Sequence, residues 1–429
     1  MKEYYNIIII GSGPAGLGAA FYLIENNPKL RILIIDKNKY SSGGLMNDCK
    51  QNYTYPIGFT EELWNLSDAN NYLEIVKNHL NPIIIENTNL SIYQERANKL
   101  NVKLLDIKQS HVGTDKSKIL INNLISRLKK LGVDFLLGES VLYIFENSVK
   151  MSNVTNIGFD KVILATGRKD FDFLQEVMNS HNIKYTDNTL DVGIRIETKI
   201  ENYSIVRDYY DPKFYFSNKV RTFCTNSGRA MVVPEQYKDF KIVNGHSLSD
   251  NKRNNGLVNF AILKTIGLQD PVRSGSQMGL YLARLANEIG GGKPISQRVG
   301  DFRIGKRSTE KTFNNDLYNF KPTYNTTKGD IGLAIPSKIM RDIWSALKQL
   351  DSIIPGVLHP STIMYYPEIK YYANKPEFIN NNFKVKENMY MVGDGAGTSR
   401  GITGAWASGI RAAKGVLNEF KGEIGGEPR

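Results

Sequence analysis

Short apolar runs that end in glycine or aspartate recur along the chain and predict buried parallel strands. The first run covers residues 5–10 and ends at Gly11, and the second covers residues 31–35 and ends at Asp36. Apolar runs of this length without alternation are typical of strands that are covered on both faces. Between them, residues 14–24 carry apolar side chains at helical spacing. The N-terminus therefore predicts a βαβ unit.

Short apolar runs occur again later in the chain, and the residues between them follow a different pattern of apolar and polar positions. Further apolar strands are expected at residues 161–165 and 389–392, and a final helix at 403–420. Between them, segments such as 191–197 and 213–216 alternate and predict half-buried strands. The predicted fold class is α/β, a Rossmann-type FAD-binding domain with an inserted α+β domain that binds substrate. The expected boundaries are 1–170 and 385–429 for the first domain and 171–384 for the second.

Composition narrows the class of protein. The chain has 429 residues, a net charge of +12 and two cysteines, Cys49 and Cys224. Two cysteines exclude a disulfide framework and an iron–sulfur site built from four thiolates, their separation in the sequence excludes a Cys-x-x-C dithiol, and no metal site is expected. No apolar stretch reaches the roughly 18 residues of a membrane span, so we expect a cytoplasmic protein. The positive charges are scattered, which favours compositional bias over a nucleic-acid partner.

The loop after the first strand predicts a dinucleotide site. Gly11-Ser12-Gly13-Pro14-Ala15-Gly16 fits G-x-G-x-x-G between a strand and a helix, and Asp36 follows at about the required 20 residues. The glycines permit a tight turn and close approach of a pyrophosphate, which the helix N-terminus attracts, and the aspartate accepts bonds from ribose hydroxyls. The expected contacts are Gly11, Gly13, Pro14, Ala15, Gly16, Asp36 and Lys37.

Two later segments indicate that the dinucleotide is FAD. Residues 164–168 and 391–397 follow predicted strands, and the second leads into Gly401-Ile402-Thr403-Gly404-Ala405. Together they resemble the later signatures of the glutathione-reductase-like FAD-binding superfamily. By this resemblance Asp394 binds the ribitol, and the start of the last helix faces the flavin pyrimidine ring, where it favours negative charge. The other expected contacts are Gly43, Gly44, Val141, Thr166, Gly167, Gly393, Gly404 and Ala405.

Motifs spread over most of the chain resemble a narrower group, the uncharacterised FAD-dependent dehydrogenases of bacteria and archaea. They include Asn47-Asp48-Cys49-Lys50, His111-Val112-Gly113-Thr114-Asp115, Arg221-Thr222-Phe223-Cys224 and Val243-Asn244-Gly245. In this family a Cys-x-Cys-Pro-Gly-Gly stretch stands where the present chain has Cys224-Thr225-Asn226-Ser227-Gly228. One thiol is therefore left where relatives carry two, which argues against a mechanism based on a cysteine pair. The resemblance implies fold and flavin but no substrate.

Three residues are candidates for the chemistry, each with a structural alternative. His111 is a candidate proton donor or substrate anchor, or it simply packs beside a helix start. Lys50 either binds a substrate carboxylate or the charge of reduced flavin, or forms a loop ion pair. Cys224 either borders the active site from the inserted domain or is a small apolar core residue.

The expected function is oxidoreduction with non-covalently bound FAD, which exchanges hydride with a small organic substrate, with reduction of an unsaturated bond as one reaction. No second G-x-G-x-x-G marks a nicotinamide domain. Electrons then pass through transiently bound NAD(P)H, an external electron carrier or the substrate itself. Two alternatives stay open: a basic flavoprotein that acts on nucleic acid, as in tRNA modification, and a regulatory flavoprotein without turnover.

Overall fold

In this computed structural model the described residues are 3–40, 45–46, 49–152, 156–237, 239–248, 254–267, 274–316, 320–371 and 374–424. The chain forms two compact units. The first combines residues 1–83, 110–188 and 372–429, and the second combines 84–109 and 189–371. The second unit thus includes a segment, 84–109, that the sequence boundaries assigned to the first domain.

The first unit is built on a sheet in the order β21-β22-β9-β1-β2-β6, which is parallel except that β21 is antiparallel to β22. Its central strand β1 (Tyr4–Ile10) pairs in parallel with β2 (Ile32–Asp36) and with β9 (Ile157–Leu164), and β9 pairs in parallel with β22 (Met389–Met391). From Ile7 to Ile9 the side chains of β1 are fully buried, as expected for a strand covered on both faces. Outside the centre lie β6 (Asp134–Leu137), β21 (Lys384–Lys386) and the hairpin of β7 (Val141–Ile144) and β8 (Ser148–Met151).

Helices cover this sheet. The helix α1 (Pro14–Asn26) connects β1 to β2 and packs against the last helix, α10 (Gly401–Ile424). The other helices of the unit are α2 (Leu66–Leu80), α4 (Thr114–Lys130) and α5 (Phe171–Ser180). A two-stranded sheet of β3 (Lys50–Asn52) and β5 (Gln109–His111) stands apart from the main sheet, as does the pair β10 (Tyr185–Asp187) and β20 (Asn374–Pro376). The predicted fold class, a Rossmann-type FAD-binding fold, is confirmed.

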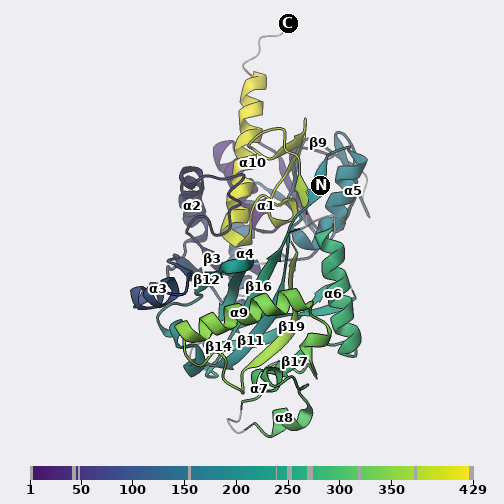
Figure 1. The fold of residues 1–429 in the computed structure, drawn as a ribbon. Coiled ribbons are helices and arrows are strands. Elements are labelled where there is room, and N and C mark those ends of the chain that lie inside the picture. The colour runs from purple at the N-terminus through teal and green to yellow at the C-terminus, as the bar shows by residue number, and fades with distance from the viewer. Residues whose placement is uncertain are drawn as a thin grey trace. The chain divides into compact units, whose positions relative to one another are not determined.

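The second unit is a largely antiparallel sheet in the order β18-β17-β19-β11-β16-β13-β12-β4. Helix α9 (Ser337–Ile353) lies across one of its faces (Figure 1). The strands are β4 (Lys103–Leu105), β11 (Leu190–Lys199), β12 (Lys213–Phe216), β13 (Val220–Asn226), β16 (Leu257–Ile266), β17 (Ile295–Arg298), β18 (Thr327–Lys328) and β19 (Ile363–Tyr371). The remaining elements are the hairpin β14 (Arg229–Tyr237) and β15 (Phe240–Leu248), with α3 (Leu90–Asn98), α6 (Gly275–Ile289), α7 (Val299–Arg303) and α8 (Glu310–Asn314).

The central strand β11 corrects one sequence prediction. Its alternation predicts a half-buried strand, but every residue from Leu190 to Thr198 is buried. One face carries Val192, Ile194 and Ile196, whereas the other carries charged side chains. The hairpin β14–β15 covers the charged face, because a Cβ built on Gly245 would lie 2.2 Å from Nη1 of Arg195. Alternation therefore marks a polar interior layer here and not contact with solvent.

Candidate functional site

The three glycine-containing motifs of the first unit meet at one edge of its sheet. Gly11 follows β1, Thr166 follows β9 and Gly393 follows β22, and these strands are neighbours that run in parallel. The loops touch, because a Cβ on Gly11 would lie 2.3 Å from the Ala165 carbonyl oxygen. Ligands of open α/β sheets bind at this carboxyl edge. Segments far apart in the sequence therefore form one site.

The helix α1 opens directly into this edge. Gly13 is its N-cap residue, Pro14 stands in its first turn, and no side chain caps it. A Cβ built on Gly13 would meet no atom of the described chain within 4 Å. The first-turn N–H groups and the positive end of the helix dipole therefore face open space, which suits a pyrophosphate. Ala15 and Gly16 follow as buried residues of the first turn.

Asp36, the predicted ribose ligand, is buried and already hydrogen-bonded. Its Oδ2 accepts bonds from the backbone N–H and the hydroxyl of Ser12, at 2.8 and 2.7 Å. Its Oδ1 accepts bonds from the backbone N–H of Asn38 at 2.9 Å and from its side-chain amide at 3.1 Å. A ribose hydroxyl would join or replace these side-chain donors. Lys37, the next predicted contact, forms an ion pair with Asp170.

Three other predicted contacts with the cofactor are Val141, Gly43 and Gly44. Val141 is the first residue of β7 and pairs with Met151 across the β7–β8 hairpin. Gly43 and Gly44 lie outside the described residues. The expected adenine contact at Val141 stays a prediction.

The opposite end of the site contains polar atoms that lack a partner. Oδ1 of Asp394 and the hydroxyl of Thr166 are buried and have no hydrogen-bond partner among the described residues. The other carboxylate oxygen of Asp394 accepts a bond from the Gly401 N–H at 3.3 Å. Buried polar groups normally have partners. A ribityl chain with its hydroxyl groups would supply them here, so these residues fit FAD.

Burial also affects the charge of Asp394. Loss of solvent raises the pKa of this carboxyl group above its ordinary value, although Arg168 and Arg400 act in the opposite direction. The charged form of this carboxyl group is therefore held at a cost in free energy. A hydroxyl donor would lower that cost, because hydrogen bonds to the charged form stabilise it.

We expect Asp394→Asn to weaken FAD binding by about 10–100-fold, the value of one charge-assisted hydrogen bond. The same change should raise the stability of the FAD-free protein near pH 7. Because the folded-state pKa is raised, the stability of the unmodified protein falls as pH rises from the ordinary aspartate pKa through the raised one. Asparagine removes this dependence. Urea unfolding near pH 4 and pH 7, with an FAD titration, measures both effects, and an equal pH response of the two proteins would contradict the account.

Lys50 and His111, two of the three predicted catalytic residues, lie on paired strands. Lys50 begins β3 and His111 ends β5, and these strands form their own two-stranded sheet. That sheet contacts the start of α10, where the Thr403 hydroxyl donates to the Asn52 carbonyl at 2.5 Å. The first unit thus brings a lysine and a histidine near the predicted pyrimidine end of the flavin.

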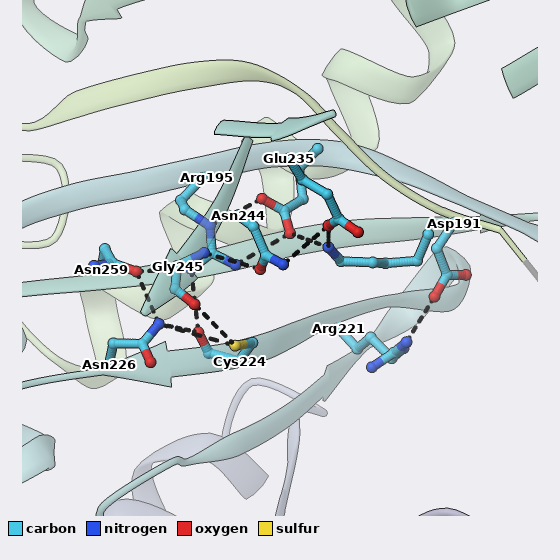
Figure 2. Close-up of polar contacts among 11 residues, drawn as sticks. Asp191, Arg195, Arg221, Cys224, Asn226, Glu235, Asn244, Gly245 and Asn259 are labelled. Atoms are coloured by element: carbon cyan, nitrogen blue, oxygen red, sulfur yellow. Dashed lines mark hydrogen bonds and ion pairs between the residues drawn. The ribbon is translucent and has the colours of Figure 1, made fainter. Parts of the chain in front are cut away.

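Cys224, the third predicted catalytic residue, lies in the second unit at an irregular point of β13. It adopts a positive φ of 49°, and the pairing of β13 with β16 shifts register between Phe223 and Asn226. Figure 2 shows the polar cluster around it. Its carbonyl accepts bonds from Arg195 Nη1 at 3.2 Å and from the Asn226 amide at 3.1 Å. The thiol is half-buried.

A network of buried charges supports this point of the sheet. Arg195 donates to both carboxylate oxygens of Glu368, at 2.9 and 3.1 Å, and to Oδ1 of Asn259 at 2.7 Å. Lys370 lies 2.9 Å from the same carboxylate. Together the two cations outweigh desolvation and hold the pKa of Glu368 below its ordinary value. A left-handed residue other than glycine stores strain and is held by its surroundings, as here.

One segment of the site was missed by the sequence analysis. Residues 53–64 pack along the turn between Asp394 and α10, as shown by the bond from Arg400 N–H to the Gly58 carbonyl at 2.9 Å. A Cβ on Gly404 would lie 2.0 Å from that carbonyl oxygen. Glycine is thus needed at position 404 because the Gly58 carbonyl leaves no room for a side chain, whatever Gly404 contributes to flavin binding. The available signal was the density of aromatic residues with Pro56 and Gly58.

Comparison with known proteins finds similarity to two family models and to an uncharacterised relative. The family model described as pyridine nucleotide-disulphide oxidoreductase matches residues 5–202, and the one described as FAD-dependent protein, C-terminal domain-like matches residues 189–370. An uncharacterised protein of Clostridium beijerinckii is 23% identical over 455 aligned residues, which cover 96% of this chain and 81% of that protein.

Two solved structures are similar to this chain at low sequence identity. A geranylgeranyl bacteriochlorophyll reductase-like protein of Thermoplasma acidophilum is 12% identical with a TM-score of 0.42, over 98% of this chain and 80% of that one. L-proline dehydrogenase of P. horikoshii is 12% identical with a TM-score of 0.43, over 99% and 95%. Likenesses this distant carry no argument about the reaction.

The sheet edge and the two family matches define the class: this is an FAD-binding flavoprotein with a Rossmann-type domain. The two matches, over residues 5–202 and 189–370, support an FAD-dependent oxidoreductase. The predicted cofactor, FAD, is confirmed.

Cys49 lies in the first unit and Cys224 in the second, and no other cysteine occurs, so the chain has no Cys-x-x-C dithiol. Over the described part of the chain, no helix combines the length and the apolar character that crossing a membrane requires.

Proposed function

We propose that the protein exchanges hydride between non-covalently bound FAD and a small organic substrate, and that it reduces an unsaturated bond. The observation that supports this reaction is the position of Lys50 and His111 on the β3–β5 sheet, which is tied to the first turn of α10 by Thr403 and Asn52. Bound FAD supplies hydride transfer. Reduction of a double bond also needs a proton, and ammonium and imidazolium groups are suitable donors.

Each proposed residue has a distinct role in this account. His111 holds and delivers the proton, because imidazole is the side chain that most often transfers protons in catalysis. Lys50 binds the negative charge of the substrate or of the reduced cofactor. The N-terminus of α10 adds a positive dipole end on the same side. Cys224 lies in the second unit, and a role in the reaction stays a prediction for it. Oxidation of a C–H or C–N bond is the reverse use of the same groups.

The first experiment is anaerobic absorbance spectroscopy of the purified holoprotein as NADPH and then NADH are added. We expect flavin bands near 370 and 450 nm, about the range of any protein-bound flavin, which bleach on addition of one nicotinamide. Bands that persist with both nicotinamides would contradict a nicotinamide-driven reductase and favour an external electron carrier. Absence of flavin after reconstitution with FAD would overturn the proposal.

A matched pair of variants separates proton delivery from electron entry. His111→Gln should leave the rate of flavin bleaching within about threefold, because electron entry needs no proton from this residue. Reoxidation of the flavin by an unsaturated acceptor should slow by about 100-fold or more, the usual contribution of a general acid. His181→Gln is the histidine control, because His181 caps the end of α5 and belongs to none of the predicted site motifs. Equal slowing of both half-reactions would contradict the role of His111.

A further inference from the structure

We propose that Trp64 is a positioning residue for the FAD site. By holding the Thr398 carbonyl, it fixes the turn that connects Asp394 to the first turn of α10. This inference rests on the FAD site described above, and it adds a residue that lies outside every dinucleotide motif of the chain. Trp64 is 3% exposed and Thr398 is fully buried, so the bond between them is made away from water.

Thr398 is held from two sides. The indole N–H of Trp64 donates to its backbone carbonyl at 2.7 Å. Its own hydroxyl accepts from the Gly393 N–H at 2.8 Å and donates to the Gly393 carbonyl at 3.1 Å. Gly393 immediately precedes Asp394, whose Oδ1 has no hydrogen-bond partner in the described part of the chain. The path from the indole to the predicted ribitol ligand therefore runs through one buried threonine.

The segment that carries Trp64 follows the same turn along its length. Phe59 forms an isolated β-bridge with Ser399, and the Arg400 N–H donates to the Gly58 carbonyl at 2.9 Å. We call residues 58–64 the brace. Its backbone lies directly against that of the turn, because a Cβ on Gly58 would be 2.7 Å from the Arg400 carbonyl oxygen. The brace thus contacts the turn at residues 398–400 and reaches Gly404 in α10.

The indole itself has little freedom to turn. Its ring packs edge-on against Phe59 at 5.0 Å and Tyr72 at 5.5 Å, and Phe383 lies at 5.6 Å. On its face lies the guanidinium of Arg411, 4.7 Å from the ring, and the same group donates to the Leu63 carbonyl at 2.7 Å. Aromatic and cation–π contacts of this kind favour one ring orientation. The N–H is therefore directed at Thr398 before any cofactor arrives.

Such an arrangement lowers the cost of binding. A turn that is already ordered loses less conformational freedom when a ligand binds, and the gain appears as affinity. Without the indole N–H, the buried Thr398 carbonyl keeps only the long bond from the Thr60 hydroxyl, at 3.5 Å, and the turn relaxes. Asp394 and the α10 N-terminus, at the two ends of the turn, would then move relative to each other.

The test compares Trp64→Phe with Trp406→Phe. Both tryptophans are buried, but the indole nitrogen of Trp406 has no hydrogen-bond partner among the described residues. Each change removes similar ring volume, whereas only the first removes a bond to the turn. We expect Trp64→Phe to raise the FAD dissociation constant of the apoprotein by about 5–100-fold. Trp406→Phe should stay within about threefold, while urea unfolding shows similar losses in both apoproteins.

A spectroscopic reading separates positioning from simple stability. At saturating FAD, the visible circular dichroism of the flavin should change in Trp64→Phe and not in Trp406→Phe. Only the first substitution alters the surroundings of the flavin ring. Equal dissociation constants in the two variants, or an unchanged flavin spectrum in Trp64→Phe, would overturn the proposal. FAD that also fails to bind the unmodified chain would instead refute the cofactor site itself.

Arg411→Met provides an independent variant if Trp64→Phe does not fold. It keeps the indole N–H but removes the guanidinium that orients the ring and holds Leu63. We expect a smaller increase in the FAD dissociation constant, about 3–10-fold, in the same direction. An unchanged constant in a well-folded Arg411→Met protein would count against the brace.

Discussion

Replacing Arg195 with methionine is expected to lower the free energy of unfolding by about 3–5 kcal/mol, the usual cost of removing one partner of a buried ion pair. Arg195 and Glu368 are both fully buried, and the guanidinium contacts both carboxylate oxygens. Methionine would leave the carboxylate with Lys370 alone and the Cys224 carbonyl without its charged donor. Urea unfolding followed by circular dichroism measures the loss.

Two controls test the physical reason for this loss. Lys99→Met removes a cation from an exposed pair with Glu95, and it should leave the free energy of unfolding almost unchanged, because solvent screens such pairs. Arg195→Met combined with Glu368→Leu should recover part of the loss, because no unpaired carboxylate is then buried. A loss of unfolding free energy below about 1 kcal/mol for Arg195→Met alone would show that burying the Glu368 carboxylate without Arg195 does not destabilise the fold.

Gly13→Ala is expected to reduce FAD affinity by about 10–100-fold while leaving the apoprotein stable to within about 0.5 kcal/mol. The added methyl group meets no atom of the described chain, and φ is −74°, which any residue adopts. It would instead occupy the space before the α1 N-terminus where the pyrophosphate is expected. FAD titration by flavin fluorescence, with urea unfolding, measures both quantities.

Gly11→Ala makes the opposite comparison at the same loop. Its φ is +110°, and the methyl group would lie 2.3 Å from the Ala165 carbonyl oxygen, so the fold itself should be destabilised. The two variants together therefore separate a glycine required by the ligand from one required by the chain. Normal FAD binding by Gly13→Ala would mean that the pyrophosphate takes another path.

The parts of the site that local rules describe were predictable. A buried strand, a glycine turn and a helix follow one another within about 20 residues in the βαβ unit, and their geometry depends on nearby residues alone. The strands before Thr166 and Gly393 were recognisable for the same reason. Their meeting at one edge followed from the parallel order of β1, β9 and β22.

The parts that depend on distant packing were not predictable. Trp64 and its acceptor Thr398 are separated by 334 positions, and no sequence period connects them. The alternation in β11 was read as contact with solvent because the hairpin that covers Arg195 comes later in the chain. The left-handed conformation of Cys224 likewise comes from Arg195 and Asn226, not from the residues beside it.

The order of the sheet has a consequence for the growing polypeptide on the ribosome. Strand β9 pairs with β1 and, at residues 157–158, with β8, but β22, its partner over residues 162–164, begins at Met389, more than 200 positions later. During translation this part of the edge of β9 is therefore unpaired while residues 189–371 of the second unit are synthesised, and such edges recruit other strands. Because Asp394 and α10 come later still, the flavin can be captured only after these residues have been made. Cellular supply of FAD and of chaperones at that moment should govern the yield of active protein.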